Sequence, residues 1–260
     1  MIIPIARCVL LGFPGLLGVA GWGSLPAVGD IQLKAVPDHI RVGAFYHGVP
    51  LHVDADVPAC DDVAVKVEGA HQQATLNKRG RVLGIWLNVA QVTVNNAPQA
   101  YLLAASRELD DICPVEEQAA LGLGFEALRT RMACTSEQPL TGREPDQFVQ
   151  LKKHAGTYAF STNVDLSWTD GDRRHVCAVL PIPATMSAGQ YTLRLYCFEH
   201  GRLVHEASAP ISIEMVGLPR LLTGLALAHP AVHGLVAIGA ALVAGLVMGV
   251  VFNPAARRRR

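Results

Sequence analysis

The sequence predicts a mainly β protein: an antiparallel immunoglobulin-like β-sandwich with a helical insertion, followed by one C-terminal transmembrane helix. Three observations support this fold class. Within residues 30–217, short apolar runs alternate with polar residues at a period of two. Two segments in the middle of the chain change to helical spacing. Near the C-terminus, residues 231–252 carry no charge.

The composition is apolar for a protein of this length. Half of the 260 residues are hydrophobic and 17% are charged, and 22 basic residues balance 22 acidic ones. A balanced charge gives no reason to expect a nucleic-acid partner. Because apolar residues concentrate at the two ends, we expect about one folded domain between them.

Residues 1–27 have the pattern of a secretory signal peptide. Arg7 is their only charged residue, and the apolar run of residues 8–20 follows it. Ala20 and Ala27 are both suitable as the last residue of the removed segment. The alternative is an uncleaved transmembrane helix, but the run is shorter than the ~20 residues that a span needs.

Residues 28–217 are expected to form the exported β-domain. The clearest strand pair covers residues 190–198 and 202–214, because apolar and polar residues alternate there and Glu199-His200-Gly201 supplies a turn. Repeated short strands with turns between them are typical of an antiparallel sandwich. Shorter runs with the same alternation are residues 51–57, 63–67, 82–87, 92–94, 100–104 and 175–180.

A helical insertion is expected over about residues 109–155. Apolar residues recur at helical spacing within residues 109–133 and again within residues 146–154, where Phe148 and Leu151 share one side of the expected helix. The insertion lies roughly halfway along the domain. Two small β-lobes joined by helices are therefore an alternative to one interrupted sandwich.

The C-terminal part predicts a membrane anchor. Residues 231–252 are long and apolar enough to cross the roughly 30 Å hydrocarbon core of a bilayer as a helix. Before them, residues 218–230 read as an amphipathic segment that lies in the membrane interface. Gly245 and Gly249 form a small-xxx-small pair, which can pack closely against a partner helix.

Residues 253–260 form a basic tail that indicates the orientation of the anchor. The tail ends in Arg257, Arg258, Arg259 and Arg260. Arginines beside a span stay on the cytoplasmic side of the membrane. The tail and the signal peptide therefore predict the same single-pass topology, with residues 28–217 outside the cytoplasm.

Five cysteines remain after removal of the signal peptide, in a compartment that is oxidising. Cys113 and Cys134 flank the first helical segment and could close a loop as a disulfide. Cys177 and Cys197 lie on neighbouring predicted strands. They could form a second disulfide or stay apart as small buried side chains.

No catalytic, cofactor-binding or metal-binding residue is predicted. The sequence lacks the paired-histidine patterns of zinc sites, a nucleophile elbow and a phosphate-binding glycine loop. The acidic pairs Asp61-Asp62 and Asp110-Asp111 stand at the borders of predicted elements, where carboxylates commonly cap helices or stabilise turns. We therefore assign structural roles to both pairs.

A set of short strings carries a family resemblance. In chain order they are Gly84-Ile85-Trp86-Leu87-Asn88, Ala105-Ser106-Arg107 with Leu109-Asp110, residues 122–128, Gly189-Gln190-Tyr191-Thr192, Gly201-Arg202-Leu203, Val216-Gly217-Leu218 and His229-Pro230. Over roughly residues 31–252 the chain resembles the Alph_Pro_TM family of proteobacterial transmembrane proteins. The resemblance implies a signal, an exported domain and one C-terminal span. It also implies an accessory role in handling sulfur oxyanions or organosulfonates, since family members are associated with permeases of the sulfite exporter type.

The first functional hypothesis is a non-enzymatic accessory protein in the inner membrane, with its domain facing the periplasm. Its expected partners are the membrane and an integral membrane protein, such as a sulfite or organosulfonate exporter-type permease, and no cofactor is expected. The alternative is a membrane-tethered periplasmic enzyme or redox carrier that uses a metal or a thiol. A third hypothesis is a purely structural envelope protein.

Overall fold

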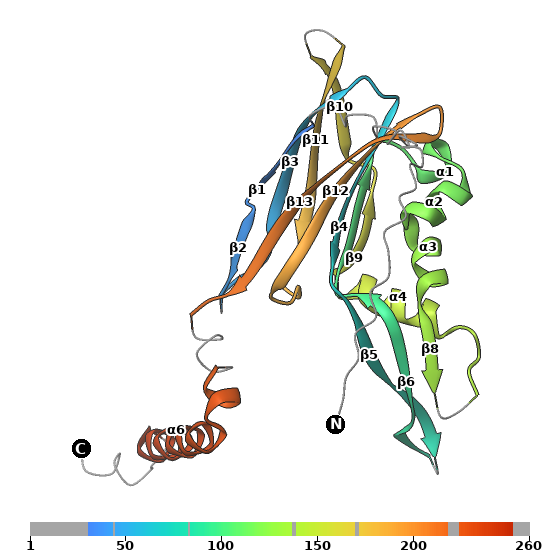
Figure 1. Ribbon diagram of the computed structural model, residues 1–260. Coiled ribbons are helices and arrows are strands. Elements are labelled where there is room, and N and C mark those ends of the chain that lie inside the picture. The colour runs from blue at the N-terminus through green and yellow to red at the C-terminus, as the bar shows by residue number, and fades with distance from the viewer. Residues whose placement is uncertain are drawn as a thin grey trace, which may run out of the picture.

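The computed structural model describes residues 31–43, 45–82, 84–136, 139–169, 172–217 and 224–251. Strands form three sheets in this part of the chain, and helices cover one of them (Figure 1). The mainly β, antiparallel fold class with a helical insertion is therefore confirmed, whereas the immunoglobulin-like topology stays a prediction. The predicted signal peptide, residues 1–27, lies outside the described residues.

One layer of the sandwich is a four-stranded antiparallel sheet. Its strands, in spatial order, are β1 (Gln32–Val36), β3 (Val49–Pro58), β11 (Arg173–Ile182) and β10 (Val164–Thr169). Alternate residues of β3 are buried, because only one face of this sheet is covered. This is the alternation that the sequence predicts for residues 51–57.

The facing layer is a six-stranded sheet. Its strands, in spatial order, are β2 (His39–Val42), β13 (Arg202–Met215), β12 (Gly189–Glu199), β4 (Asp62–Gly69), β7 (Tyr101–Ala105) and β9 (Tyr158–Ser161). The two edge strands, β2 and β9, pair in parallel with their neighbours, and the inner pairs are antiparallel. Every residue of β7 is buried, since both faces of the sheet are covered there.

Two hydrophobic cores lie on the two faces of the six-stranded sheet. The core between the sheets contains Val65 of β4 together with Leu51 of β3. The core under the helices contains Ala64 of β4 together with Tyr101 and Phe148. Neighbouring residues of β4 therefore belong to different cores, because successive side chains of a strand point to opposite faces.

Four helices cover the outer face of the six-stranded sheet (Figure 1). They are α1 (Leu109–Ile112), α2 (Val115–Leu121), α3 (Gly124–Arg131) and α4 (Glu144–His154). The predicted helical segment of residues 109–133 is therefore three short helices. Pro114 precedes the first turn of α2, and Gly122 ends α2 in the left-handed conformation with a φ of 65°.

The position predicted for α4 is confirmed, but the structure buries only one of the two apolar residues expected on its inner side. Phe148 is buried as expected. Leu151 is 54% exposed, and Val149 supplies the second buried side chain. Helical periodicity allowed either residue beside Phe148, and the packing of the helix on the sheet selects Val149.

A third, three-stranded sheet extends beyond one end of the sandwich (Figure 1). Its strands are β5 (His71–Val82), β6 (Ile85–Pro98) and β8 (Ala133–Ser136), and β6 lies in the middle. The prediction of one strand over residues 82–87 is wrong, because β5 ends at Val82 and pairs there with Ile85 at the start of β6. Gly84, with a φ of 86°, lies in the turn between them.

The predicted membrane anchor is the helix α6 (Pro230–Val251). Residues 230–250 have a mean hydropathy of 2.2, and no part of the most apolar stretch is buried against the rest of the described chain. Residues 224–228, within the predicted amphipathic segment, are also helical. Residues 218–223 and the predicted basic tail, residues 253–260 with its four arginines, lie outside the described residues.

Candidate functional site

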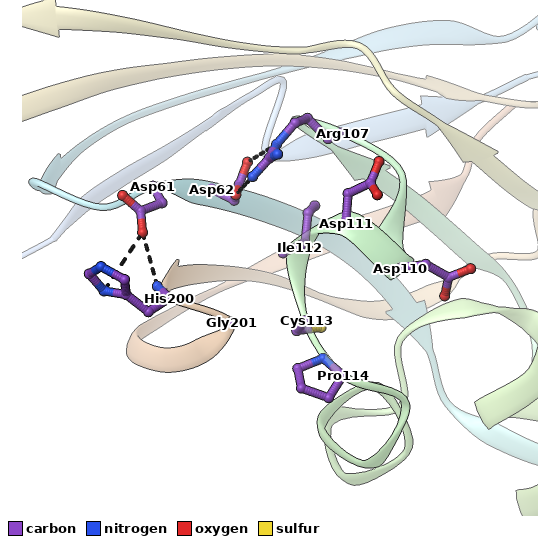
Figure 2. A pocket seen from close by; sticks show the side chains of 10 residues that line it. All are labelled: Asp61, Asp62, Arg107, Asp110, Asp111, Ile112, Cys113, Pro114, His200 and Gly201. Carbon is purple, nitrogen blue, oxygen red and sulfur yellow. Dashed lines mark hydrogen bonds and ion pairs between the residues drawn. The ribbon is translucent and has the colours of Figure 1, made fainter.

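An open pocket of about 560 Å³ lies at the end of the sandwich where β12 turns into β13 (Figure 2). The start of β4, the end of β7, helix α1 and the β12–β13 turn all contribute to it. The residues that line it are Asp61, Asp62, Arg107, Asp110, Asp111, Ile112, Cys113, Pro114, His200 and Gly201. Four of these ten side chains are carboxylates, and only one is a guanidinium.

Asp62, the first residue of β4, is the most constrained of the four carboxylates. It is 5% exposed, and both of its oxygens accept hydrogen bonds from Arg107, one of them from Nε at 2.8 Å. Ser106 Oγ donates to Asp62 Oδ1 at 2.9 Å. The hydrogen bonds from Arg107 outweigh burial and lower the pKa of Asp62 below its usual value. Asp62 is therefore ionised at neutral pH and held by the fold.

Asp61 stabilises the turn between β12 and β13. Its Oδ2 accepts the backbone N–H of His200 at 2.9 Å and lies 4.0 Å from His200 Nδ1 (Figure 2). His200 and Gly201 have φ values of 49° and 80°, as a two-residue hairpin turn of type I′ requires. The hairpin predicted around this turn is confirmed.

Asp110 and Asp111 lie in the first turn of α1, and both side chains are exposed. Asp110 Oδ1 accepts a hydrogen bond from Gln118 Nε2 at 3.0 Å. The structure thus brings this acidic pair to the same pocket as Asp61 and Asp62. Sequence reasoning missed this because each pair has a sufficient local explanation at the border of its own element, and the two pairs are far apart in the chain.

The charge of the pocket limits what it can bind. Three carboxylates face the solvent without the guanidinium partner that Asp62 has in Arg107. Such a surface attracts cationic groups and repels anions. Across the ranges that the structure describes, no three His, Cys, Asp or Glu side chains gather where they could hold a metal ion. The pocket is therefore an acidic contact surface, and no metal centre is assigned to it.

The cysteine that lines the pocket is a poor nucleophile. Cys113 follows α1 and is buried. Burial, with the nearby charges of Glu117 and Asp110, raises the pKa of its thiol to about 11. Since the thiolate is the reactive form of cysteine, Cys113 is almost fully protonated and unreactive at neutral pH.

Neither predicted disulfide is formed in the structure, where all five described cysteines are free. Cys177 lies between Val176 and Ala178 of β11, which point into the core, so it faces the outer side of its sheet. Cys197 points into the core from the other sheet, in the same cluster as Cys60. This opposite placement keeps Cys177 and Cys197 apart.

The two cysteines of the other predicted pair lie on different elements. Cys113 follows α1, whereas Cys134 pairs with Val94 within the sheet of the β5–β6 hairpin. Both side chains belong to the core under the helices or pack against it. They act there as small apolar residues.

Gly245 and Gly249, the predicted helix-packing pair, lie one turn apart on α6. Apart from the adjoining backbone of α6 and the two chain neighbours, no described atom lies within 4 Å of the position that a β-carbon would occupy at either glycine. The close approach that these glycines permit is therefore not used by the described part of this chain.

Two comparisons with known proteins bear on the identity of the chain. The model of the family described as "Putative transmembrane protein (Alph_Pro_TM)" matches residues 30–254. This match includes both layers of the sandwich, the pocket and α6. A comparison with curated proteins finds no match.

Proposed function

This chain belongs to the Alph_Pro_TM family of transmembrane proteins, and from that premise we propose that it is a non-enzymatic, membrane-anchored accessory protein. In this proposal α6 crosses the bilayer, and the β-domain stays outside it beside an integral membrane protein. The observation that carries the proposal is α6 itself. Its central stretch is apolar and remains unburied by the described domain.

The character of α6 favours a span over a core helix. A helix that packs on a globular domain has one apolar face and one polar face, whereas α6 has no charged residue on any side. Its 22 residues, at 1.5 Å per residue, match the roughly 30 Å of a hydrocarbon core. Anchoring of this kind raises the effective concentration of the domain beside a membrane partner without requiring a tight interface.

We further propose that the domain faces the periplasm from the inner membrane. Two features of the sequence support this orientation. Arg7 and the apolar run after it have the order of a secretory signal, and the four arginines after α6 belong on the cytoplasmic side.

The partner that we propose is an integral membrane permease of the sulfite exporter type. The acidic pocket argues against a role of that pocket in binding the transported anion, because its carboxylates would repel a sulfur oxyanion. The domain would instead support the complex by contact with the partner protein. Its acidic pocket is suited to a basic segment of that partner.

One face of α6 is suited to contact a helix of the partner. At 100° per residue, Gly234, Ala241, Gly245 and Gly249 fall within about 80° of one another. Small residues on one face let two helix backbones approach closely in a bilayer. Gly239 lies roughly 120° from Gly245 and roughly 80° from Gly249, outside the arc of these four residues, and serves as a control.

Co-purification of the full, epitope-tagged chain from mild detergent tests the proposal. The wild-type chain is expected to bring down a multi-span membrane protein that mass spectrometry identifies as the same protein in repeated preparations. Gly245→Leu with Gly249→Leu is expected to reduce its recovery several-fold, and Gly239→Leu is expected to leave it unchanged. Recovery of the wild-type chain only as a monomer would contradict the accessory role, and equal loss in the control would contradict the assigned helix face.

A further inference from the structure

The β5–β6 hairpin carries charge of one sign. The segment from His71 to Pro98 contains Lys78, Arg79 and Arg81 and has no aspartate or glutamate. Directly after Arg81, residues 82–87 read Val-Leu-Gly-Ile-Trp-Leu, so the sequence places no polar side chain at the tip. The hairpin therefore has an apolar tip, with basic residues directly before it in β5.

The side chains that the structure describes at this tip are exposed. Ile85 is 64% exposed and Leu87 is 49% exposed. Both point to the same face of β6, since they are two residues apart on one strand. Lys78 and Arg81 are exposed as well. Arg81 Nε donates a hydrogen bond to the carbonyl oxygen of Gly84 at 3.3 Å, which keeps its guanidinium beside the turn.

The hairpin leaves the sandwich at the end from which the chain continues to its anchor. Gly69 of β4 and Ile211 of β13 both pair with Tyr191 of β12, so the C-terminal ends of β4 and β13 lie at the same end of the sheet. β5 begins at His71, directly after β4, and extends away from that end (Figure 1). After β13 the chain continues toward α6.

The lengths of the two segments are compatible with a shared membrane surface. The 12 residues of β5 extend about 40 Å from the sandwich, at ~3.3 Å per residue. Between Met215 and Pro230 there are 14 residues, of which 224–228 are helical, so they span at most about 38 Å. The anchor therefore keeps this end of the sandwich close enough to the bilayer for the hairpin to touch the membrane surface.

We propose that the apolar tip of the β5–β6 hairpin, with Ile85 and Leu87, and the basic residues beside it, Lys78 and Arg81, dock on the surface of the bilayer that α6 enters. Ile85 and Leu87 enter the interface between headgroups and acyl chains, where exposed apolar side chains are stabilised. Lys78 and Arg81 bind the phosphates of anionic phospholipids. The protein then contacts the membrane at two places, which fixes the orientation of its domain.

Lipid is favoured over a protein partner as the occupant of this tip. The anchor already places a bilayer next to the hairpin, whatever other protein is present. Exposed basic side chains that flank an apolar tip match the order of a membrane surface, with phosphates outside and acyl chains beneath. The inference needs the anchor but not the permease partner of the proposed function, so the two can fail separately.

Acylation of Lys78 in the full chain tests the proposal. The protein is reconstituted into nanodiscs of phosphatidylcholine alone or with phosphatidylglycerol, and the rate of acylation by an amine-reactive ester is followed by mass spectrometry. Lys78 is expected to react at least about fivefold more slowly in the anionic discs, and Lys34, exposed on β1, is expected to react equally fast in both. About 0.5 M salt is expected to remove most of the difference, because it screens the attraction.

Two variants separate the tip from general electrostatics. Arg81→Glu with Ile85→Ser and Leu87→Ser is expected to bring the rate of Lys78 in anionic discs to that in neutral discs. Arg202→Glu makes the same charge change in the exposed turn at the opposite end of the sheet and is expected to preserve the protection. An unchanged thermal unfolding midpoint in detergent shows that each variant is folded.

Three outcomes overturn the proposal. The first is an equal rate of Lys78 acylation in anionic and neutral discs for the wild-type chain. The second is protection that depends on a co-purified protein and not on the lipid, which would make the tip a protein interface. The third is equal loss of protection in the Arg202→Glu variant, which would mean that overall charge and not the tip causes the effect.

Discussion

The acidic pocket and the β5–β6 hairpin lie at opposite ends of the six-stranded sheet and have opposite charge. The pocket gathers four aspartates around one arginine, and the hairpin carries three basic residues and no acidic one. The formal net charge of the whole chain is nevertheless zero. A neutral total therefore conceals a segregated distribution, which can orient a tethered domain relative to a charged surface.

The two regions also differ in how firmly the fold holds their charged groups. Asp62 is buried and bonded to Arg107 and Ser106, and Asp61 is bonded to the turn at His200. Lys78 and Arg81 of the hairpin are exposed. We therefore expect substitutions in the pocket to change stability, and substitutions in the hairpin to change surface contacts.

The largest expected effect concerns the thiol in the pocket. Because burial and neighbouring carboxylates raise the pKa of Cys113 to about 11, its thiolate fraction at pH 8 is about a hundredfold below that of an ordinary cysteine. Alkylation of Cys113 by iodoacetamide should be slower by about this factor in the native chain than in urea. Peptide mapping by mass spectrometry measures both rates. Similar rates in the two states would show that the fold does not raise the pKa of this thiol.

Asp62→Ala should produce the next largest effect. It leaves Arg107 and Ser106 without their acceptor and is expected to lower the free energy of unfolding by about 2 kcal/mol, because Arg107 is partly solvated and recovers some of the loss. Thermal unfolding in mild detergent should show a midpoint about 5 °C lower. Asp110→Ala, in the same pocket but exposed, is the control and should change stability by less than about 0.5 kcal/mol. Equal effects of both substitutions would contradict the distinction between held and exposed carboxylates.

Acid sensitivity should follow the carboxylates that the fold holds. The pKa of Asp62 is lowered by Arg107, and the pKa of Glu144 is lowered to about 2 because its Oε1 accepts hydrogen bonds from the backbone N–H and the hydroxyl of Thr141, both at 2.8 Å. Both groups have a lower pKa in the folded state than in the unfolded state. Their stabilisation is therefore complete above about pH 5 and is lost as the pH falls toward 2.

The measurement is the unfolding midpoint between pH 2 and pH 7. The unfolding temperature of the wild-type chain should decrease as the pH falls below 5. Asp62→Asn with Glu144→Gln should make this decrease smaller. The hairpin contains no carboxylate, so Lys78→Gln should leave the shape of the profile unchanged. An identical acid profile for the double variant would place the acid-sensitive groups elsewhere.

The smallest expected effect on stability belongs to the hairpin. Lys78→Glu with Arg81→Glu reverses the charge of exposed side chains and should change the free energy of unfolding by less than about 0.5 kcal/mol. Thermal unfolding in detergent, where no anionic lipid is present, measures this directly. A loss as large as that of Asp62→Ala would show that the basic residues of the hairpin are structural.

Sequence reasoning succeeded where one element explains its own pattern. The β12–β13 hairpin was predictable from strand alternation and from His200-Gly201, because a short hairpin turn is determined by adjacent residues. It failed over residues 82–87, where apolar residues continue from β5 through the turn into β6. A run of apolar residues does not show where the chain reverses, and here only Gly84 marked the turn.

The candidate site was less predictable than the fold. Asp61-Asp62 and Asp110-Asp111 were recognised as acidic pairs, yet nothing local connects them to each other or connects Asp62 to Arg107. Likewise, the strand alternation around Cys177 and Cys197 does not show that Cys197 points into the core between the sheets whereas Cys177 points to the outer face of its sheet. Whether two cysteines on different sheets can form a disulfide depends on which faces of the sheets pack together. Alternation within one strand does not determine this.

The sequence by itself determined the C-terminal apolar helix, the β class and the main hairpin, because each depends on hydrophobic pattern and turn chemistry within a short stretch of chain. Only the tertiary structure decided that two distant acidic pairs meet in one pocket and that a basic hairpin projects from the other end of the sheet. The physical reason is that strand order and layer packing place residues from distant segments side by side, and no local periodicity encodes that placement.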